Sequence, residues 1–170
     1  MTSFSKLKNF EATTEKTVWY GTGISLGSRD GVPIELELLV CHAGQGNKDY
    51  LNVVARRSAA KAQAKGGRGG RLKRAGSSAA QELTIEQQVA RDIEAVNESR
   101  NDDREDYPGT VIRGWRGAYD DEGRETEFTV ANCRDLLANL PDEHFDPLRV
   151  FVNQMGNFMP VADPEHLAKN

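Results

Sequence analysis

The sequence predicts an α+β fold in which two β-hairpins and about four helices share a mixed core, with a charged middle segment that is either flexible or ordered only on assembly. Residues 17–40 alternate apolar and polar side chains around an Asp-Gly turn, which is typical of a β-hairpin with one solvent-exposed face. Later segments place apolar residues three and four positions apart, the spacing of one helix face. Residues 56–106 are densely charged and carry few large apolar side chains.

Composition limits the classes of protein that the chain can represent. Its 170 residues, 38% of them hydrophobic, allow one compact domain or a small domain with an extended arm. A formal net charge of -4 argues against a protein that binds nucleic acid over its whole surface. No apolar run approaches the roughly 20 residues of a membrane span, and no signal peptide is evident, so we expect a cytoplasmic protein without a membrane partner.

The first elements are expected to be an N-terminal arm at 1–15 and a hairpin plus helix at 16–65. In the arm, large apolar residues recur at every third position, either as one face of a short helix or as anchors on a partner: Phe4, Leu7 and Phe10. The hairpin turns at Asp30-Gly31, and Pro33 opens its second strand. Asn47 is expected to cap the helix that follows.

A Gly/Arg-rich linker at 66–83 is expected to separate that helix from a charged helix at 84–106. Paired glycines end a helix because each is about 1 kcal/mol less favourable than alanine. Thr84 and Gln87 form a capping-box pattern at the start of the second helix. Its apolar stripe is narrow and consists of Ile85, Val89, Ile93 and Val96. Beyond Asn97 charge takes over, so we expect that end to fray or project.

The last third is expected to be a hairpin plus two-helix module at 107–160, followed by a polar tail at 161–170. A strand carrying Trp115 leads into an acidic turn and a short return strand. Thr129 is placed to cap the first helix. The regular part of the second helix is expected to begin with Asp146 as cap and Pro147 as its first residue.

No arrangement of residues predicts catalysis, a cofactor or a metal. The three histidines lie far apart, and Cys41 and Cys133 lack the local pairing of a zinc site, so both are expected to be buried thiols. The glycine-rich stretches at 43–49 and 66–73 fail the spacing of a phosphate-binding loop. We therefore expect a protein that is not an enzyme.

Charge is unevenly distributed along the chain. Basic residues from 56 to 74 are uninterrupted by acids, whereas acids dominate from 82 to 106. The basic segment could bind a nucleic-acid backbone, the two segments could complement each other within one chain or between copies, or both could be solvated. The absence of aromatic residues from 51 to 106 favours complementarity over single-strand binding. The candidate contacts are Arg56, Arg57, Lys61, Arg68, Arg71, Lys73 and Arg74.

A motif in the last third has a recognisable order: a Trp strand, an Asp/Gly turn, a helix opened by Asn and closed by Leu-Pro-Asp, and a final Asn-Phe. The residues that carry it are Trp115, Asp121, Gly123, Phe128, Asn132, Leu136, Leu137, Leu140, Pro141, Asp142, Phe145, Asn157 and Phe158. This pattern, over about 110–158, resembles the tail assembly chaperones of tailed bacteriophages.

The resemblance implies a non-enzymatic helper that binds phage proteins, namely the tape-measure or tail-tube protein or neighbouring copies of itself, in the host cytoplasm during tail assembly. Such a helper must expose apolar stripes to its helical partner. The candidates are Ile85, Val89, Ile93 and Val96 on one helix, and an edge formed by Phe145, Phe151 and Phe158. Two alternatives stay open: a structural subunit of the virion in the head, connector or tail, and an accessory protein that binds nucleic acid through 56–74.

Overall fold

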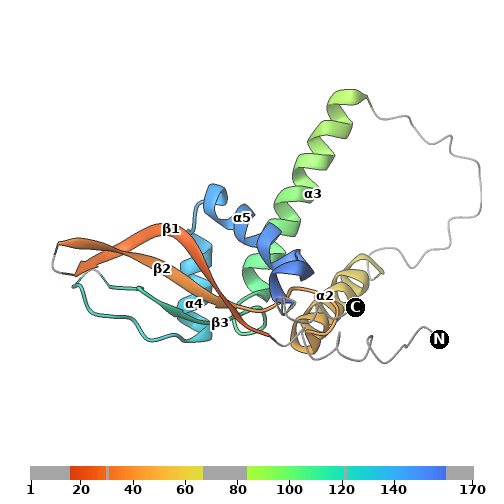
Figure 1. The fold of residues 1–170 in the computed structure, drawn as a ribbon. Coiled ribbons are helices and arrows are strands. Elements are labelled where there is room, and N and C mark those ends of the chain that lie inside the picture. Colours follow the sequence, from red (N-terminus) through yellow and green to blue (C-terminus); the bar gives the residue numbers. More distant parts are fainter. Residues whose placement is uncertain (1–15, 30, 67–83, 121, 160–170) are drawn as a thin grey trace, which may run out of the picture.

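The computed structural model describes residues 16–159 except 30, 67–83 and 121, and within this part the predicted α+β class is confirmed (Figure 1). The predicted arm at 1–15, nearly all of the linker and the tail lie outside the described residues. In chain order the elements are β1 (Val18–Arg29), β2 (Val32–Val40), α2 (Lys48–Gly66), α3 (Ile85–Asp106), β3 (Ile112–Arg116), α4 (Val130–Asn139), α5 (Asp142–Asn153) and the 3₁₀ turn η2 (Met155–Phe158).

Strands β1 and β2 form the predicted hairpin. They pair antiparallel, with Tyr20 opposite Leu38 and Val18 opposite Val40. Gly31 has φ 78° in the turn, a backbone conformation that a residue without Cβ adopts readily. The alternation along β2 buries Leu36, Leu38 and Val40 completely and leaves Glu35 and Glu37 on the opposite face. The hairpin therefore supplies one side of the core.

Strand β3 joins this hairpin instead of forming a second one. It pairs antiparallel with β2, Leu38 opposite Trp115, and gives a three-stranded sheet of order β1-β2-β3. The expected return strand makes only the single bridge between Tyr119 and Glu125. The return segment is held by a side chain instead of a full strand pairing, because the Trp115 indole N–H donates to the Thr126 carbonyl at 2.7 Å.

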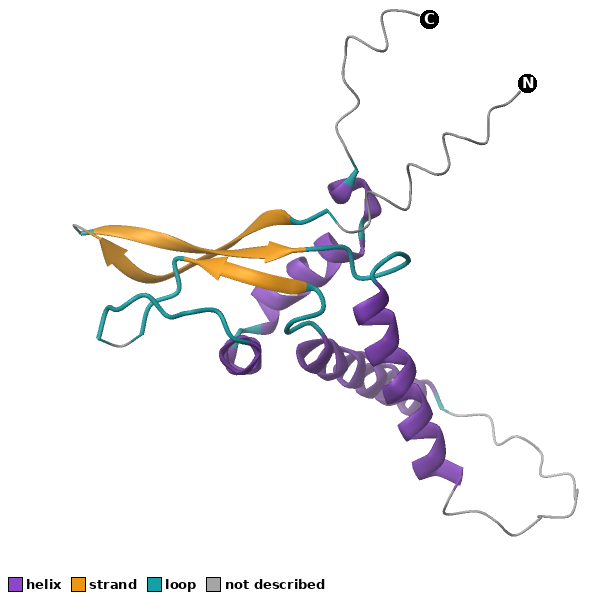
Figure 2. Cartoon of the chain, turned by 90° about the horizontal axis from the view of Figure 1, so that it is seen from below, coloured by secondary structure: helices purple, strands orange, loops and turns teal. Residues whose placement is uncertain are grey.

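The core lies between the sheet and the helices α4 and α5. Figure 2 shows the sheet at one end of the molecule and the helices α2 and α3 at the other. Cys133 is completely buried and Cys41 nearly so, and both are free thiols, as predicted. The core members are Leu36, Leu38, Val40, Ala43, Tyr107, Val111, Ile112, Ala118, Cys133, Leu137, Leu140, Phe145, Leu148, Val152 and Phe158.

The beginnings of the helices follow their predicted caps in three of four cases. The side-chain oxygen of Asn47 accepts the Tyr50 N–H at 3.1 Å, and the Thr129 hydroxyl accepts the Asn132 N–H at 3.0 Å. The capping box at Thr84 is complete.

Helix α5 is the exception, because it begins at Asp142 and contains Pro147 in its interior. The earlier start places Phe145 and Leu148 on the buried face of the helix, and this packing outweighs the hydrogen bond that proline cannot make.

Helix α3 contradicts the expected fraying of its charged end. Asp106 at its C-terminus is 3% exposed, and the next residue, Tyr107, is fully buried. Every residue from 84 to 99 is exposed instead, and Figure 1 shows the helix extending away from the sheet. The charged half of α3 is therefore the anchored half, and the half with the apolar stripe projects into solvent.

Replacing Trp115 by Ala should lower the free energy of unfolding by about 3 kcal/mol, because the half-buried indole packs edge-on against Phe128 with ring centroids 5.2 Å apart. Trp115→Phe, which keeps a ring but loses the hydrogen bond to Thr126, should cost only about 1 kcal/mol. Urea denaturation measures both. Equal midpoints for Trp115→Ala and the unmutated chain would show that the indole does not stabilise the module.

Candidate protein-binding site

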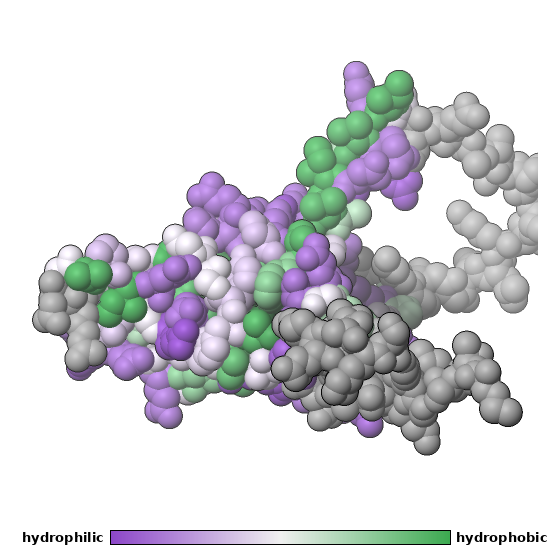
Figure 3. Space-filling model, viewed as in Figure 1, coloured by the Kyte–Doolittle hydropathy of each residue, from purple (hydrophilic) through white to green (hydrophobic). Residues whose placement is uncertain are grey.

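The exposed half of α3 carries the apolar stripe that the sequence predicts. The exposed fractions of its side chains are 84% for Ile85, 51% for Val89, 57% for Ile93 and 50% for Val96. With 3.6 residues per turn, these four positions fall within about 80° of the helix circumference. Figure 3 shows them as a continuous hydrophobic band along the projecting helix. Four β-branched side chains on one narrow face thus form an apolar surface that no other described residue covers.

The stripe ends in a shallow groove at the foot of the exposed half, with a volume of about 400 Å³. Its lining residues are Val89, Asp92, Ile93, Val96, Asn97 and Arg100. The Arg100 guanidinium closes this end, since its Nε and Nη2 donate to the two carboxylate oxygens of Asp146 at 2.9 and 2.7 Å. These hydrogen bonds lower the pKa of Asp146. The lower end of the groove is therefore formed by an arginine of α3 that is bound to α5.

The opposite side of α3 is docked on α2 by charge. The Arg57 and Lys61 side chains reach Asp102 at 2.7 and 2.6 Å, and Lys61 also reaches Glu98 at 2.6 Å. Although partial burial opposes it, the hydrogen bonds from Lys61 and Arg57 lower the pKa of Asp102. The basic and acidic segments thus complement each other within one chain at these positions.

Asp106 is the most deeply buried acid of this docking. Its Oδ1 lies 2.6 Å from Arg57 Nη2, but the two groups are not aligned as a hydrogen bond. Burial raises the pKa of Asp106, and the charge of Arg57 opposes that rise. The ionised carboxylate is therefore supported mainly by the Coulomb attraction of one guanidinium.

A second group of ion pairs docks α3 on α4 and α5, and the sequence interpretation missed it. Arg104 Nη2 lies 2.7 Å from Asp142 and donates to the Leu140 carbonyl at 2.8 Å, while Arg149 Nη2 lies 2.6 Å from Asp103. Burial raises the pKa of Asp103 despite the nearby Arg149. The spacing of these residues in the sequence could have indicated the ion pairs. Arg100 and Arg104 lie four residues apart, as do Asp142 and Asp146, so each pair shares a helix face.

The described part of the basic segment offers little free positive charge. Arg57 and Lys61 are engaged with carboxylates of α3, and Arg56 is exposed without an ion pair to any described residue. The remaining candidates, Arg68, Arg71, Lys73 and Arg74, lie outside the described residues. Of the three described basic candidates, only Arg56 is not ion-paired with a described residue and could contact a nucleic-acid phosphate.

The predicted apolar edge of Phe145, Phe151 and Phe158 is wrong. Phe145 is fully buried and Phe158 is 1% exposed, so neither can receive a partner. Phe151 is half-buried and packs against Tyr20, with ring centroids 4.9 Å apart. The reason is that η2 folds back over α5, where the side-chain amide of Asn157 donates to the Phe151 carbonyl at 2.9 Å. This edge belongs to the core.

The described residues that carry the phage resemblance mostly serve the fold. Leu137, Leu140, Phe145 and Phe158 are buried, and the Asn132 side chain donates to the Glu127 carbonyl at 3.0 Å. Asp121 lies outside the described residues. The motif therefore specifies a scaffold, and it does not include the exposed stripe on α3.

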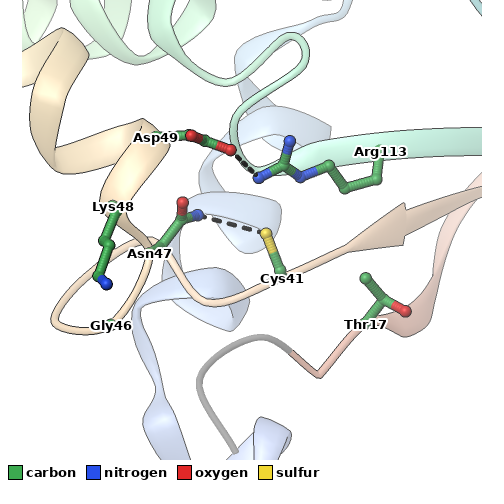
Figure 4. A pocket seen from close by; sticks show the side chains of 7 residues that line it. All are labelled: Thr17, Cys41, Gly46, Asn47, Lys48, Asp49 and Arg113. Atoms are coloured by element: carbon green, nitrogen blue, oxygen red, sulfur yellow. Dashed lines mark hydrogen bonds and ion pairs between the residues drawn. The ribbon is translucent and has the colours of Figure 1, made fainter. Parts of the chain in front are cut away.

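A cavity of about 420 Å³ at the start of α2 is the other feature that merits chemical scrutiny (Figure 4). Two of its charged groups are paired with each other, since Arg113 Nη2 lies 2.7 Å from Asp49. The side-chain amide of Asn47 contacts Cys41 Sγ at 3.3 Å, and burial raises the pKa of that thiol. The other lining residues are Thr17, Gly46 and Lys48. A thiol whose pKa is raised is not an activated nucleophile.

Within the described residues, no three His, Cys, Asp or Glu side chains gather closely enough to hold a metal ion. None of the helices in this part combines the length and apolar character needed to cross a membrane.

Comparisons of the chain with protein-family models, with curated proteins and with solved structures gave no match. What α3 binds is therefore inferred from the exposure, charge and position of its stripe.

Replacing Arg57 by Ala should lower the free energy of unfolding by about 3 kcal/mol, because it leaves the buried Asp106 carboxylate without its cation. Arg56→Ala is the matched control, since this neighbouring arginine is exposed and should change stability by no more than about 0.5 kcal/mol. Urea midpoints at pH 7 measure both. Equal losses from the two variants would show that the contact between Arg57 and Asp106 does not anchor α3.

Proposed function

We propose that this chain is a non-enzymatic morphogenesis protein of a tailed phage, which binds an apolar helical segment of the tape-measure or tail-tube protein during tail assembly. The exposed stripe of Ile85, Val89, Ile93 and Val96 on the projecting half of α3 carries this proposal. The resemblance of residues 110–158 to tail assembly chaperones supplies the biological setting, and the stripe supplies a surface that such a task requires.

The geometry of the stripe favours a helical partner. A face about 80° wide and about three turns long matches the i, i+4, i+7 contacts by which one helix packs along another. Each half-exposed side chain that such a partner covers should contribute about 1 kcal/mol. Glu86 and Asp92 lie at the two borders of the stripe, whereas Arg91 and Glu94 lie near the opposite face of the helix, so a partner segment flanked by lysine or arginine would be preferred.

The anchoring of α3 also supports a binding role. Most of the ion pairs to α2, α4 and α5 lie in the charged half of the helix, and the polar contacts that other described elements make to residues 84–99 are those of Lys61 with Glu98 and of Arg149 with Ser99. A helix held at one end presents its other end at a defined place and lowers the entropy lost when a partner binds.

The same stripe would suit a permanent virion subunit, whose α3 packs on a neighbouring protein in the particle. Peptide mass spectrometry of purified particles beside the lysate separates the two roles. Abundant peptides in the lysate with none in the particles would identify a departing chaperone. Stoichiometric peptides in the particles would identify a structural component of the head, connector or tail.

The double variant Val89→Gln/Ile93→Gln should weaken binding to the tape-measure protein of the same phage by about 30-fold, which corresponds to about 1 kcal/mol for each lost apolar contact. Glutamine keeps a high helix propensity, so α3 itself should persist. Titration of the two purified proteins, followed by calorimetry, measures the change.

The matched control is Val130→Gln/Val150→Gln, because these side chains are 45% and 57% exposed on α4 and α5 and lie outside the stripe. The control should bind as the unmutated chain does. Undiminished binding by the stripe variant, with its helix content intact by circular dichroism, would refute the proposed role of α3. Repeating the titration with the tail-tube protein distinguishes the two partners.

A further inference from the structure

The outer face of α2 carries a second row of exposed side chains with the spacing of the stripe on α3. Leu51 begins this row and is 44% exposed, although its side chain is large and apolar. The α2 row consists of exposed residues at positions i, i+4, i+8 and i+11: Leu51, Ala55, Ala59 and Ala62. The stripe has the same intervals, with Ile85, Val89, Ile93 and Val96. Each set therefore occupies a face about 80° wide, and the two faces can lie side by side over about three turns.

We infer that the stripe on α3 of one copy of the chain packs on the α2 row of a second copy. The two surfaces of one chain cannot meet, because Arg57 and Lys61 hold α2 against another side of α3. Their partners on that side, Glu98 and Asp102, lie about 140° or more around the helix from the centre of the stripe. Figure 2 shows both helices at the end of the molecule away from the sheet, where the sheet does not obstruct a neighbouring copy.

The side chains of the two surfaces complement each other in size. Alanines make up three of the four members of the α2 row, whereas all four members of the stripe are branched. The small side chains leave room for isoleucine and valine, so the two helices can approach to about 8 Å. With the helices parallel and Leu51 beside Ile85, the equal intervals also bring Ala62 beside Val96. The contact then covers the whole apolar stripe.

In this parallel alignment the facing borders of the two surfaces carry opposite charges. Arg56 borders the α2 row and is exposed, without an ion pair to any described residue. Asp92 borders the stripe, where the side chain of Gln88 donates a hydrogen bond to it at 3.0 Å. Between copies, Arg56 and Asp92 would differ by only about 3 Å along the helix axis. An antiparallel alignment would place Arg56 beside Ala90 instead, so the charges favour the parallel one.

The contact joins two different surfaces, so copies add to one another head to tail and form either a closed ring or an open row. It is about 17 Å long between helices about 10 Å across, which is small beside the roughly 800 Å² per partner of a stable interface. We therefore expect weak association, with a Kd of about 100 µM. A weak contact is easily displaced by a helix of the tape-measure protein that takes the stripe. This displacement rests on the proposed function, whereas the contact between copies does not.

Analytical ultracentrifugation of the purified full chain, with no partner present, tests the contact. Between about 10 and 500 µM the weight-average mass should rise past that of two copies, because head-to-tail association does not stop at a pair. Ala59→Glu should weaken self-association about 10-fold or more, because it buries a charge against the stripe. The stripe variant Val89→Gln/Ile93→Gln should have an effect of the same size.

The matched control is Ala60→Glu, which adds the same charge to the same helix at an exposed position about 100° away from Ala59. The control should assemble as the unmutated chain does, and circular dichroism should show equal helix content in all variants. An unmutated chain that stays monomeric up to about 500 µM, well above the expected Kd, would overturn the inference. Equal assembly of Ala59→Glu and Ala60→Glu would overturn it as well.

Mixing the two defective variants identifies the surfaces that meet. Ala59→Glu has an intact stripe, and the stripe variant has an intact α2 row. Each should be monomeric alone, and their mixture should form pairs and stop at two copies. If the stripe instead packed on the stripe of a second copy, Ala59→Glu would still pair with itself, and that result would overturn the inference.

A charge exchange tests the parallel alignment. Arg56→Glu and Asp92→Arg should each weaken self-association about 3-fold, the size expected for an exposed ion pair. The double variant Arg56→Glu/Asp92→Arg should associate as the unmutated chain does, because the pair is restored with its signs reversed. A double variant that associates no better than the single ones would overturn this alignment.

The outcomes separate this inference from the proposed function. If the stripe variant loses binding to the tape-measure protein but the unmutated chain never self-associates, the inference falls and the proposed function stands. If the stripe variant loses self-association but still binds the tape-measure protein, the inference stands and the proposed function falls. If both hold, Ala59→Glu should bind the tape-measure protein at least as tightly as the unmutated chain, because no second copy competes for the stripe.

Discussion

The contact between Arg57 and the carboxylates of Asp102 and Asp106 is the interaction on which the placement of α3 depends. Asp106 is almost fully buried at the junction with Tyr107, the largest fully buried side chain of the core, so this end of the helix cannot move without exposing that tyrosine. Burying an acid is unfavourable unless a cation accompanies it. Arg57 thereby couples α2 to the core, and the position of every more N-terminal residue of α3 follows from this fixed end.

Charge and apolar surface are separated along α3 in an unusual way. The residues that hold the helix in place are arginines and aspartates, whereas its valines and isoleucines face water. In most surface helices the apolar face packs on the core and the charges face solvent. In α3 this arrangement is reversed, because the ion pairs hold the helix in place without its apolar side chains. Those side chains therefore stay available to another segment or protein.

The features that the sequence predicted correctly were local ones. The Asp-Gly hairpin and the caps at Asn47, Thr84 and Thr129 depend on a few neighbouring residues, and the structure reproduces them. The features that failed depend on contacts distant in sequence. Strand β3 pairs with β2 because an edge was free, α5 starts early because Phe145 is needed in the core, and the charged end of α3 is fixed by partners 40 or more residues away, such as Arg57 and Arg149. Of the two predicted apolar stripes, only that on α3 is exposed, since periodicity alone does not distinguish a core face from an unpartnered one.

This distinction bears on how function is assigned to the chain. The motif that resembles phage tail assembly chaperones consists of residues that pack or cap the fold, among them Trp115, Leu137 and Phe145. Such residues indicate the fold and not the function. The same fold can carry different functions, so the specific function depends on side chains that do not take part in packing the fold. In the described part of this chain such side chains lie on the projecting half of α3. Its sequence and the acids at its borders therefore carry more information about partners than the motif does.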